Sequence, residues 1–136
     1  MRYLLDTNFV SELRKGERAN RGVQAWTMAN DPTQWALSVI TIGEIRTGIE
    51  DCRASEPRQA AVLEKWLAAQ VTEFSVNILA VTLEIADRWG RLMSATELPD
   101  NDLLLAATAL EHDLTVVTRD VADFRGSGVR LLNPWK

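Results

Sequence analysis

Four acidic residues stand where carboxylates from distant parts of the chain can act together. Asp6 and Asp120 each follow a short apolar run of the kind that forms a buried strand. Glu44 and Asp102 each lie near the start of a predicted helix. In an open parallel sheet, ligands bind beyond the carboxyl ends of the strands, so these junctions predict one shared site.

Each acid also has a purely structural interpretation. Asp6 and Asp120 are suitable N-caps for the helical segments that follow them. Glu44 stands three residues after Thr41, the spacing of a capping box. Asp102 would be favoured near the positive end of a helix dipole. Taken one at a time, these acids therefore do not require a functional site.

The four acids taken together favour a bound cation. Two carboxylates about 4 Å apart repel by roughly 4 kcal/mol at an effective dielectric of about 20, so a cluster is unfavourable without positive charge. Oxygen ligands without His or Cys select Mg²⁺ or Mn²⁺ over Zn²⁺. Such ions orient a water molecule, lower its pKa and neutralise charge on a phosphoryl group. We therefore expect metal-dependent hydrolysis of phosphodiester bonds.

Short strands alternate with helices along the whole chain, which is typical of a mostly parallel sheet covered on both faces. Strands are predicted at residues 2–5, 34–40, 72–76, 115–118 and 129–132. Helices are predicted at about residues 6–14, 23–29, 41–50, 58–69, 78–95 and 101–112, with one further turn at 120–124. The expected fold is a three-layer α/β/α sandwich with four to five short strands, in a single domain over residues 1–136.

Composition limits the class of protein. The 136 residues suffice for one domain with a sizeable core, and Cys52 is the only cysteine, which excludes an internal disulfide framework or a Cys-rich zinc site. No apolar stretch is long enough to span a bilayer and no signal-like segment opens the chain, so we expect a cytoplasmic protein without a membrane partner. The net charge of −4 argues against a broad basic face, but 15 acids outside the proposed cluster balance 15 bases.

Short motifs in a fixed order support the same site. They are Leu5-Asp6-Thr7-Asn8, Ile42-Gly43-Glu44-Ile45, Asp102 followed by Leu105-Ala106-Ala107-Thr108-Ala109, Val117-Thr118-Arg119-Asp120, and Asn133-Pro134-Trp135. By these motifs the chain resembles the PIN-domain ribonucleases, specifically VapC-like toxins of type II toxin–antitoxin pairs. The resemblance covers nearly the whole chain.

The resemblance implies roles for particular residues. It implies a PIN-like fold in which the metal-binding and catalytic acids are Asp6, Glu44, Asp102 and Asp120. Asp6 and Asp102 are then the first candidates for direct Mg²⁺ ligands, with Asn8 and Thr118 as polar supports. Many relatives carry Asn at the position of Asp120, so Asp100 and Asp123 remain alternatives for completing the site.

The resemblance also implies a substrate and partners. The expected protein is a Mg²⁺-dependent ribonuclease, with Mn²⁺ as a substitute, that cleaves transfer RNA or another structured RNA and is neutralised by a small antitoxin. A homodimer and a toxin–antitoxin hetero-oligomer are expected. The basic stretch with Arg14, Lys15 and Arg18 is either a solvated loop or a contact for RNA phosphates. The alternative function is metal-dependent binding of RNA or of a partner protein without cleavage.

Overall fold

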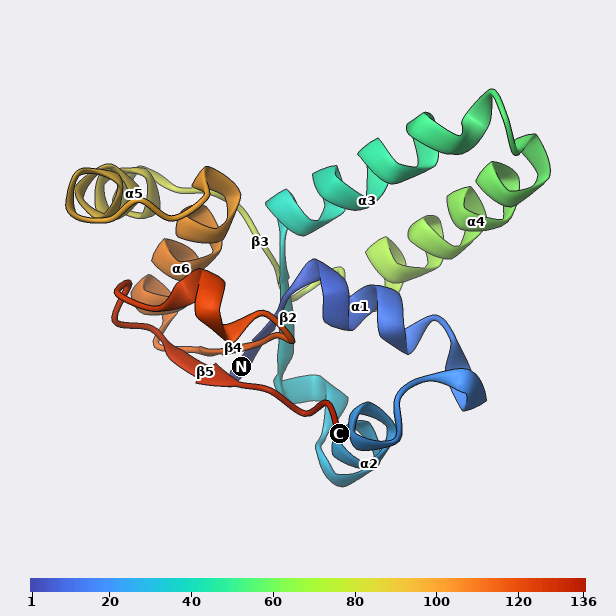
Figure 1. Cartoon of the computed structure of the whole chain (residues 1–136), viewed down its shortest axis with the longest axis horizontal. Helices are drawn as coiled ribbons and strands as arrows, with labels where there is room; N and C mark the ends of the chain where they lie inside the picture. Colours follow the sequence, from blue (N-terminus) through green and yellow to red (C-terminus); the bar gives the residue numbers. More distant parts are fainter.

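A five-stranded parallel sheet runs through the middle of the molecule (Figure 1). The computed structural model describes residues 1–136 and gives the strand order β3-β2-β1-β4-β5. The strands are β1 (Tyr3–Leu5), β2 (Trp35–Ser38), β3 (Ile78–Leu79), β4 (Thr115–Val117) and β5 (Arg130–Leu132). Because β1 is the central strand, the chain leaves the middle of the sheet at Asp6.

Helices cover both faces of the sheet (Figure 1). One side carries α1 (Thr7–Leu13), α2 (Arg21–Ala29), α3 (Val39–Arg53) and α4 (Pro57–Glu73). The other side carries α5 (Leu83–Ala95) and α6 (Asp100–His112). Short 3-10 turns form η1 (Gly16–Arg18), η2 (Pro32–Gln34) and η3 (Val121–Phe124). The predicted α/β/α sandwich is confirmed, and its sheet is parallel throughout.

Neighbouring residues of each central strand belong to two separate cores. On β1, Leu5 packs with α1, α3 and α4, whereas Leu4 packs with α6. On β4, Val117 belongs to the same core as Leu5, and Val116 belongs to the same core as Leu4. All four side chains are fully buried, which explains why these strands are continuous apolar runs without alternating polar residues. Burying one such side chain stabilises the fold by about 1.5–3 kcal/mol.

The segment between α4 and α5 differs from its prediction. The strand predicted at residues 72–76 is wrong, because α4 continues through the first two of these residues and ends where Phe74 packs into the core. The edge strand β3 comes afterwards, and it is formed by residues that were predicted to begin a helix. That helix, α5, starts later because the Thr82 hydroxyl accepts a hydrogen bond from the Ile85 amide at 3.2 Å.

The start of α3 also differs. Ser38, not Thr41, is the N-cap, and its hydroxyl accepts a hydrogen bond from the Ile40 amide at 3.0 Å. The capping box predicted between Thr41 and Glu44 is therefore wrong. Thr41 is fully buried in the first helical turn and its hydroxyl has no hydrogen-bond partner. Glu44 lies in the second turn, where its side chain contacts α1 instead.

The helix that carries Asp102 agrees closely with its prediction. α6 begins at Asp100 and is buried along most of its length, as its nearly all-apolar sequence indicates. Residues 121–124 form the expected single turn, η3. None of the helices combines the length and the apolar character that crossing a membrane requires.

Candidate functional site

The predicted acids gather at the carboxyl edge of the sheet. Asp6 directly follows β1, Asp120 lies three residues beyond β4, and Asp102 lies in the first turn of α6. Their charges influence one another, since Glu44 and Asp120 raise the pKa of Asp6 and all three raise the pKa of Asp102. Asp123 of η3 adds to the rise at Asp102. We refer to these five residues, Asp6, Glu44, Asp102, Asp120 and Asp123, as the acid cluster.

Asp6 is the buried centre of the cluster, with a relative exposure of 7%. Its Oδ1 accepts a hydrogen bond from the Thr7 amide at 2.8 Å. Its Oδ2 accepts hydrogen bonds from the Thr118 hydroxyl at 2.8 Å and from the side-chain Nδ2 of Asn8 at 3.3 Å. Burial raises the pKa of Asp6 above its ordinary value, and these hydrogen bonds oppose the rise. Because Oδ2 accepts two bonds and Oδ1 only one, Oδ1 keeps a lone pair for a ligand.

Asn8 and Thr118 connect the carboxyl end of β1 with the carboxyl end of β4. The Asn8 side-chain nitrogen lies 3.1 Å from Asp120 Oδ2 and 3.3 Å from Thr118 Oγ1. The Thr118 hydroxyl also accepts from the Asp120 amide at 3.0 Å, and Asn8 Oδ1 accepts from the Arg119 amide at 3.3 Å. These contacts fix Asp6 and Asp120 relative to each other, which is the geometry expected of polar supports.

Glu44 reaches the cluster from α3. Its Oε1 accepts a hydrogen bond from the Thr7 hydroxyl at 2.7 Å, while the side chain is otherwise exposed. Thr7 is not among the site residues that the sequence singled out. The only signal was its place in the chain between Asp6 and Asn8, which were both predicted site residues.

Asp102 is a partly buried member of the cluster whose charge no hydrogen bond stabilises. It is partly buried and accepts no hydrogen bond, and its pKa is raised to about 6, first by burial and then by the charges of Asp6 and Asp123. Asp100, on the same helix, is not among the groups that raise this pKa most. Of the two alternatives left open by the sequence, Asp123 is therefore the one whose charge acts on Asp102.

No cationic side chain pairs with the cluster, since none of the ion pairs in the structure involves its members. Arg46, two residues after Glu44, binds Glu64 at 2.6 Å on the side facing α4. Within the predicted basic stretch, Lys15 binds Glu12 at 2.9 Å. Arg14 and Arg18 are exposed and have no ion pair. The negative charge of the cluster is thus not neutralised by the protein itself.

The donor set fits a hard divalent cation. No three His, Cys, Asp or Glu side chains are arranged as a group that could hold a metal ion by themselves. Mg²⁺ does not require one, because it is usually held by one or two carboxylates and keeps several of its waters. Unpaired carboxylate oxygens with no sulfur or imidazole nearby fit Mg²⁺ or Mn²⁺ and not Zn²⁺.

Comparison with known proteins assigns the family. Residues 3–125 match the PIN domain, so the chain belongs to the PIN-domain family. The VapC ribonuclease Y4jK of Sinorhizobium fredii is 32% identical over 139 residues, which cover 98% of this chain and 97% of that protein. The predicted resemblance to VapC-like ribonucleases and the predicted nuclease class are confirmed.

Solved structures agree with this assignment. The crystal structure of FitAcB from Neisseria gonorrhoeae is similar with a TM-score of 0.88 and 32% identity, and the match covers 98% of each chain. A toxin–antitoxin complex from Klebsiella pneumoniae is similar with a TM-score of 0.69 and 29% identity, again over 98% of each chain. The chain therefore shares the fold of these two structures over 98% of their matched chains.

Proposed function

We propose that this protein is a Mg²⁺-dependent endoribonuclease that acts as the toxin of a toxin–antitoxin pair, with Mn²⁺ able to replace Mg²⁺. The observation that carries the proposal is the acid cluster, which pairs with no lysine or arginine side chain and in which Asp6 is buried and the pKa of Asp102 is raised to about 6. Membership of the PIN-domain family and similarity to a VapC ribonuclease support the nuclease activity.

Each acid has a distinct role in this proposal. Asp6 and Asp102 are the direct metal ligands, Asp6 through its Oδ1 and Asp102 through oxygens that accept no hydrogen bond. Glu44 and Asp120 complete the cluster through the carboxylate oxygens that Thr7 and Asn8 leave free. A bound divalent ion supplies a water of lowered pKa and neutralises charge on the scissile phosphate. Asn8 and Thr118 keep the carboxylates in place during the reaction.

The proposed substrate is structured RNA, with transfer RNA as the first candidate. The exposed, unpaired guanidinium groups of Arg14 and Arg18 are proposed to contact RNA phosphates outside the acid cluster. Lys15 is a weaker candidate because Glu12 already binds its ammonium group. Since the cluster repels phosphate in the absence of metal, RNA affinity is expected to depend on divalent ions more than on a basic surface.

Cleavage of purified RNA tests the proposal. The protein is incubated with total RNA or transfer RNA in Mg²⁺ or in EDTA, together with Asp6→Asn, Asp102→Asn and the control Asp51→Asn. Asp51 is an exposed acid on α3 without an ion pair. Cleavage is expected only with Mg²⁺ and only for the wild type and the control. Cleavage that persists in both cluster variants contradicts the assignment, and binding without cleavage by the wild type supports a non-catalytic binding protein.

The toxin role requires a partner. The similar Klebsiella pneumoniae structure is a toxin–antitoxin complex, which supports a small antitoxin as the partner of this chain as well. We propose that a basic antitoxin side chain enters the acid cluster. We also propose a homodimer contact on α5, where Leu83 and Met93 are exposed, within a larger hetero-oligomer.

Expression of this chain alone in the cytoplasm is expected to arrest growth, and co-expression of the adjacent small reading frame is expected to relieve it. Normal growth with the chain alone contradicts the toxin role.

A further inference from the structure

We infer that Thr7 is a positioning residue that holds the Glu44 carboxylate in the acid cluster for metal binding, an inference that rests on the proposed function. Thr7 is the first residue of α1 and donates twice. Its amide donates to Asp6 Oδ1 at 2.8 Å, and its hydroxyl donates to Glu44 Oε1 at 2.7 Å. One residue thus connects an acid at the end of β1 with an acid on α3.

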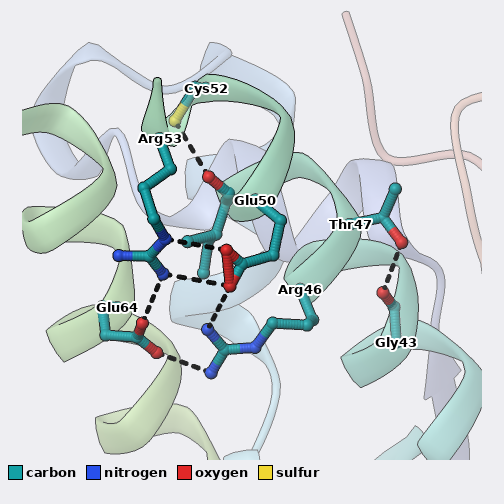
Figure 2. A network of polar contacts seen from close by, with 8 residues as sticks. Gly43, Arg46, Thr47, Glu50, Cys52, Arg53 and Glu64 are labelled. Carbon is teal, nitrogen blue, oxygen red and sulfur yellow. Dashed lines mark hydrogen bonds and ion pairs between the residues drawn. The ribbon is translucent and has the colours of Figure 1, made fainter. Parts of the chain in front are cut away.

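Glu44 depends on this contact because nothing else retains it. Its hydrogen bond with Thr7 is the only one that its carboxylate makes. The charges of Asp6 and Asp102 repel it, since the Glu44 charge adds to the rise that burial causes in the pKa of each of these two acids. The nearest arginine along α3, Arg46, turns to the opposite side, where it contacts Glu64 and Glu50 (Figure 2). Without Thr7, an exposed glutamate with three rotatable bonds would turn away from the cluster into solvent.

The hydrogen bond also makes the two oxygens of Glu44 different. Oε1 accepts one hydrogen bond from the Thr7 hydroxyl and keeps one lone pair, whereas Oε2 accepts none and keeps both lone pairs for a metal ion or for one of its waters. Residues that orient metal-binding groups in this way typically change metal affinity or activity by about 10- to 100-fold when they are replaced. Removal of the Thr7 hydroxyl is therefore expected to weaken Mn²⁺ binding by roughly this factor.

Three threonine variants of the full chain test the inference. Thr7→Val removes the hydroxyl but keeps the branched shape and the amide that donates to Asp6. Thr7→Ser restores the hydroxyl. Thr47→Val is the matched control, since Thr47 lies on α3 near Glu44 but donates only to the Gly43 carbonyl at 3.1 Å (Figure 2). Mn²⁺ affinity is measured by calorimetry on metal-free protein, and the melting temperature in EDTA reports on folding.

The expected result is about 10- to 100-fold weaker Mn²⁺ binding for Thr7→Val, and near wild-type binding for Thr7→Ser and Thr47→Val. At saturating Mg²⁺, the kcat of Thr7→Val is expected to lie closer to the wild-type value than its apparent metal affinity does. Wild-type Mn²⁺ affinity in Thr7→Val, or equal loss in Thr7→Val and Thr7→Ser, contradicts the inference. Thr7→Ala repeats the test without a branched side chain, so that a folding defect specific to valine is recognised.

A double-variant cycle separates Thr7 from a general effect on the site. If Thr7 acts through Glu44, adding Thr7→Val to Glu44→Gln changes Mn²⁺ affinity much less than it does in the wild type. Equal losses in both backgrounds contradict the inference. Wild-type protein that binds Mn²⁺ but cleaves no RNA contradicts the proposed function and leaves the role of Thr7 intact, whereas wild-type protein that binds no Mn²⁺ contradicts both.

Discussion

The network formed by Arg46, Glu50, Arg53 and Glu64 joins α3 to α4 and brings each carboxylate against a guanidinium group (Figure 2). Arg53 lies 2.7 Å from Glu50 and 2.7 Å from Glu64. The Arg46 guanidinium, followed by that of Arg53, holds the pKa of Glu64 down to about 2. The acid cluster is the reverse case, because burial and like charges raise the pKa of Asp102 to about 6 and no guanidinium group forms an ion pair with the cluster.

The comparison distinguishes charged residues that pair with one another within the fold from charged residues that are left to bind a ligand. Exposed ion pairs gain little, because water and salt screen them. Partly buried like charges oppose folding, and a ligand that binds only the folded state restores the lost stability by mass action. Four predictions test this contrast.

The largest expected effect follows from removing one charge of the acid cluster. Asp102→Asn is expected to lower kcat/KM for RNA cleavage in Mg²⁺ by more than about 100-fold, since replacing even an outer residue of a metal site has an effect of 10- to 100-fold. The same variant is expected to melt at a higher temperature than the wild type in EDTA, because one repelling charge is gone. Full activity, or a lower melting temperature in EDTA, would place Asp102 outside the cluster.

The hydrogen bonds that support Asp6 give the next effect. Thr118 is fully buried, and its hydroxyl donates to Asp6 and accepts from Asn8 and from the Asp120 amide. Thr118→Val leaves these groups without their partner and is expected to lower the free energy of unfolding by about 1–3 kcal/mol. Urea denaturation measures the change, and Thr72→Val, at an exposed threonine of α4, is the control. A loss no greater than that of the control would argue against a supporting role.

A smaller effect is expected from pH. The pKa of Asp102 in the folded protein is about 6, above its ordinary value of 3.8. The folded state therefore binds more protons between these values, and its stability is lost as the pH rises through this window. Because Asp102 is partly exposed, screening limits the contribution to about 1 kcal/mol.

The measurement is the free energy of unfolding of wild type and Asp102→Asn in EDTA, at about pH 4 and about pH 7. The wild type is expected to lose more stability between the two values than the variant does. Saturating Mg²⁺ is expected to remove this difference, since the ion favours the ionised carboxylate. A wild type that gains stability relative to the variant as the pH rises would reverse the sign of the argument.

The smallest effect is expected in the network between α3 and α4. Glu64→Gln removes one carboxylate from contact with Arg46 and Arg53, but all three side chains are exposed. Cleavage is expected to remain at the wild-type level, and any decrease in melting temperature is expected to disappear in about 0.5 M salt. If the variant loses Mg²⁺-dependent cleavage, the network also serves the site.

The sequence predicts those features of the fold that depend on local pattern. The all-apolar runs ending at Leu5 and Val117 show strands buried on both faces, and the apolar helix after Asp102 shows its central position. The start of α3 could not be read in this way. Val39 and Ile40 favour a strand by propensity, but the Ser38 cap and tertiary packing place them in a helix.

The candidate site is predictable to a different extent. The acids follow from their positions at strand and helix ends, because parallel strands bring those ends to one edge of the sheet. The contact between Thr7 and Glu44 does not follow, since it depends on how α1 and α3 pack side by side. The sequence also does not show whether Asp123 or Asp100 acts more strongly on the pKa of Asp102. Both lie close in sequence to a predicted site residue, so the answer depends on the three-dimensional structure.

The central position of β1 has a consequence for the timing of synthesis. Asp6 directly follows β1, which is synthesised before the other four strands of the sheet, but the Thr118 hydroxyl that holds its carboxylate lies 112 positions later in the chain. At about 5–20 residues per second, roughly 6–22 s separate the translation of the two residues. A nascent chain therefore carries its most buried acid long before the site around it exists. This delay follows from the separation along the chain of β1 and β4, which the sheet places side by side.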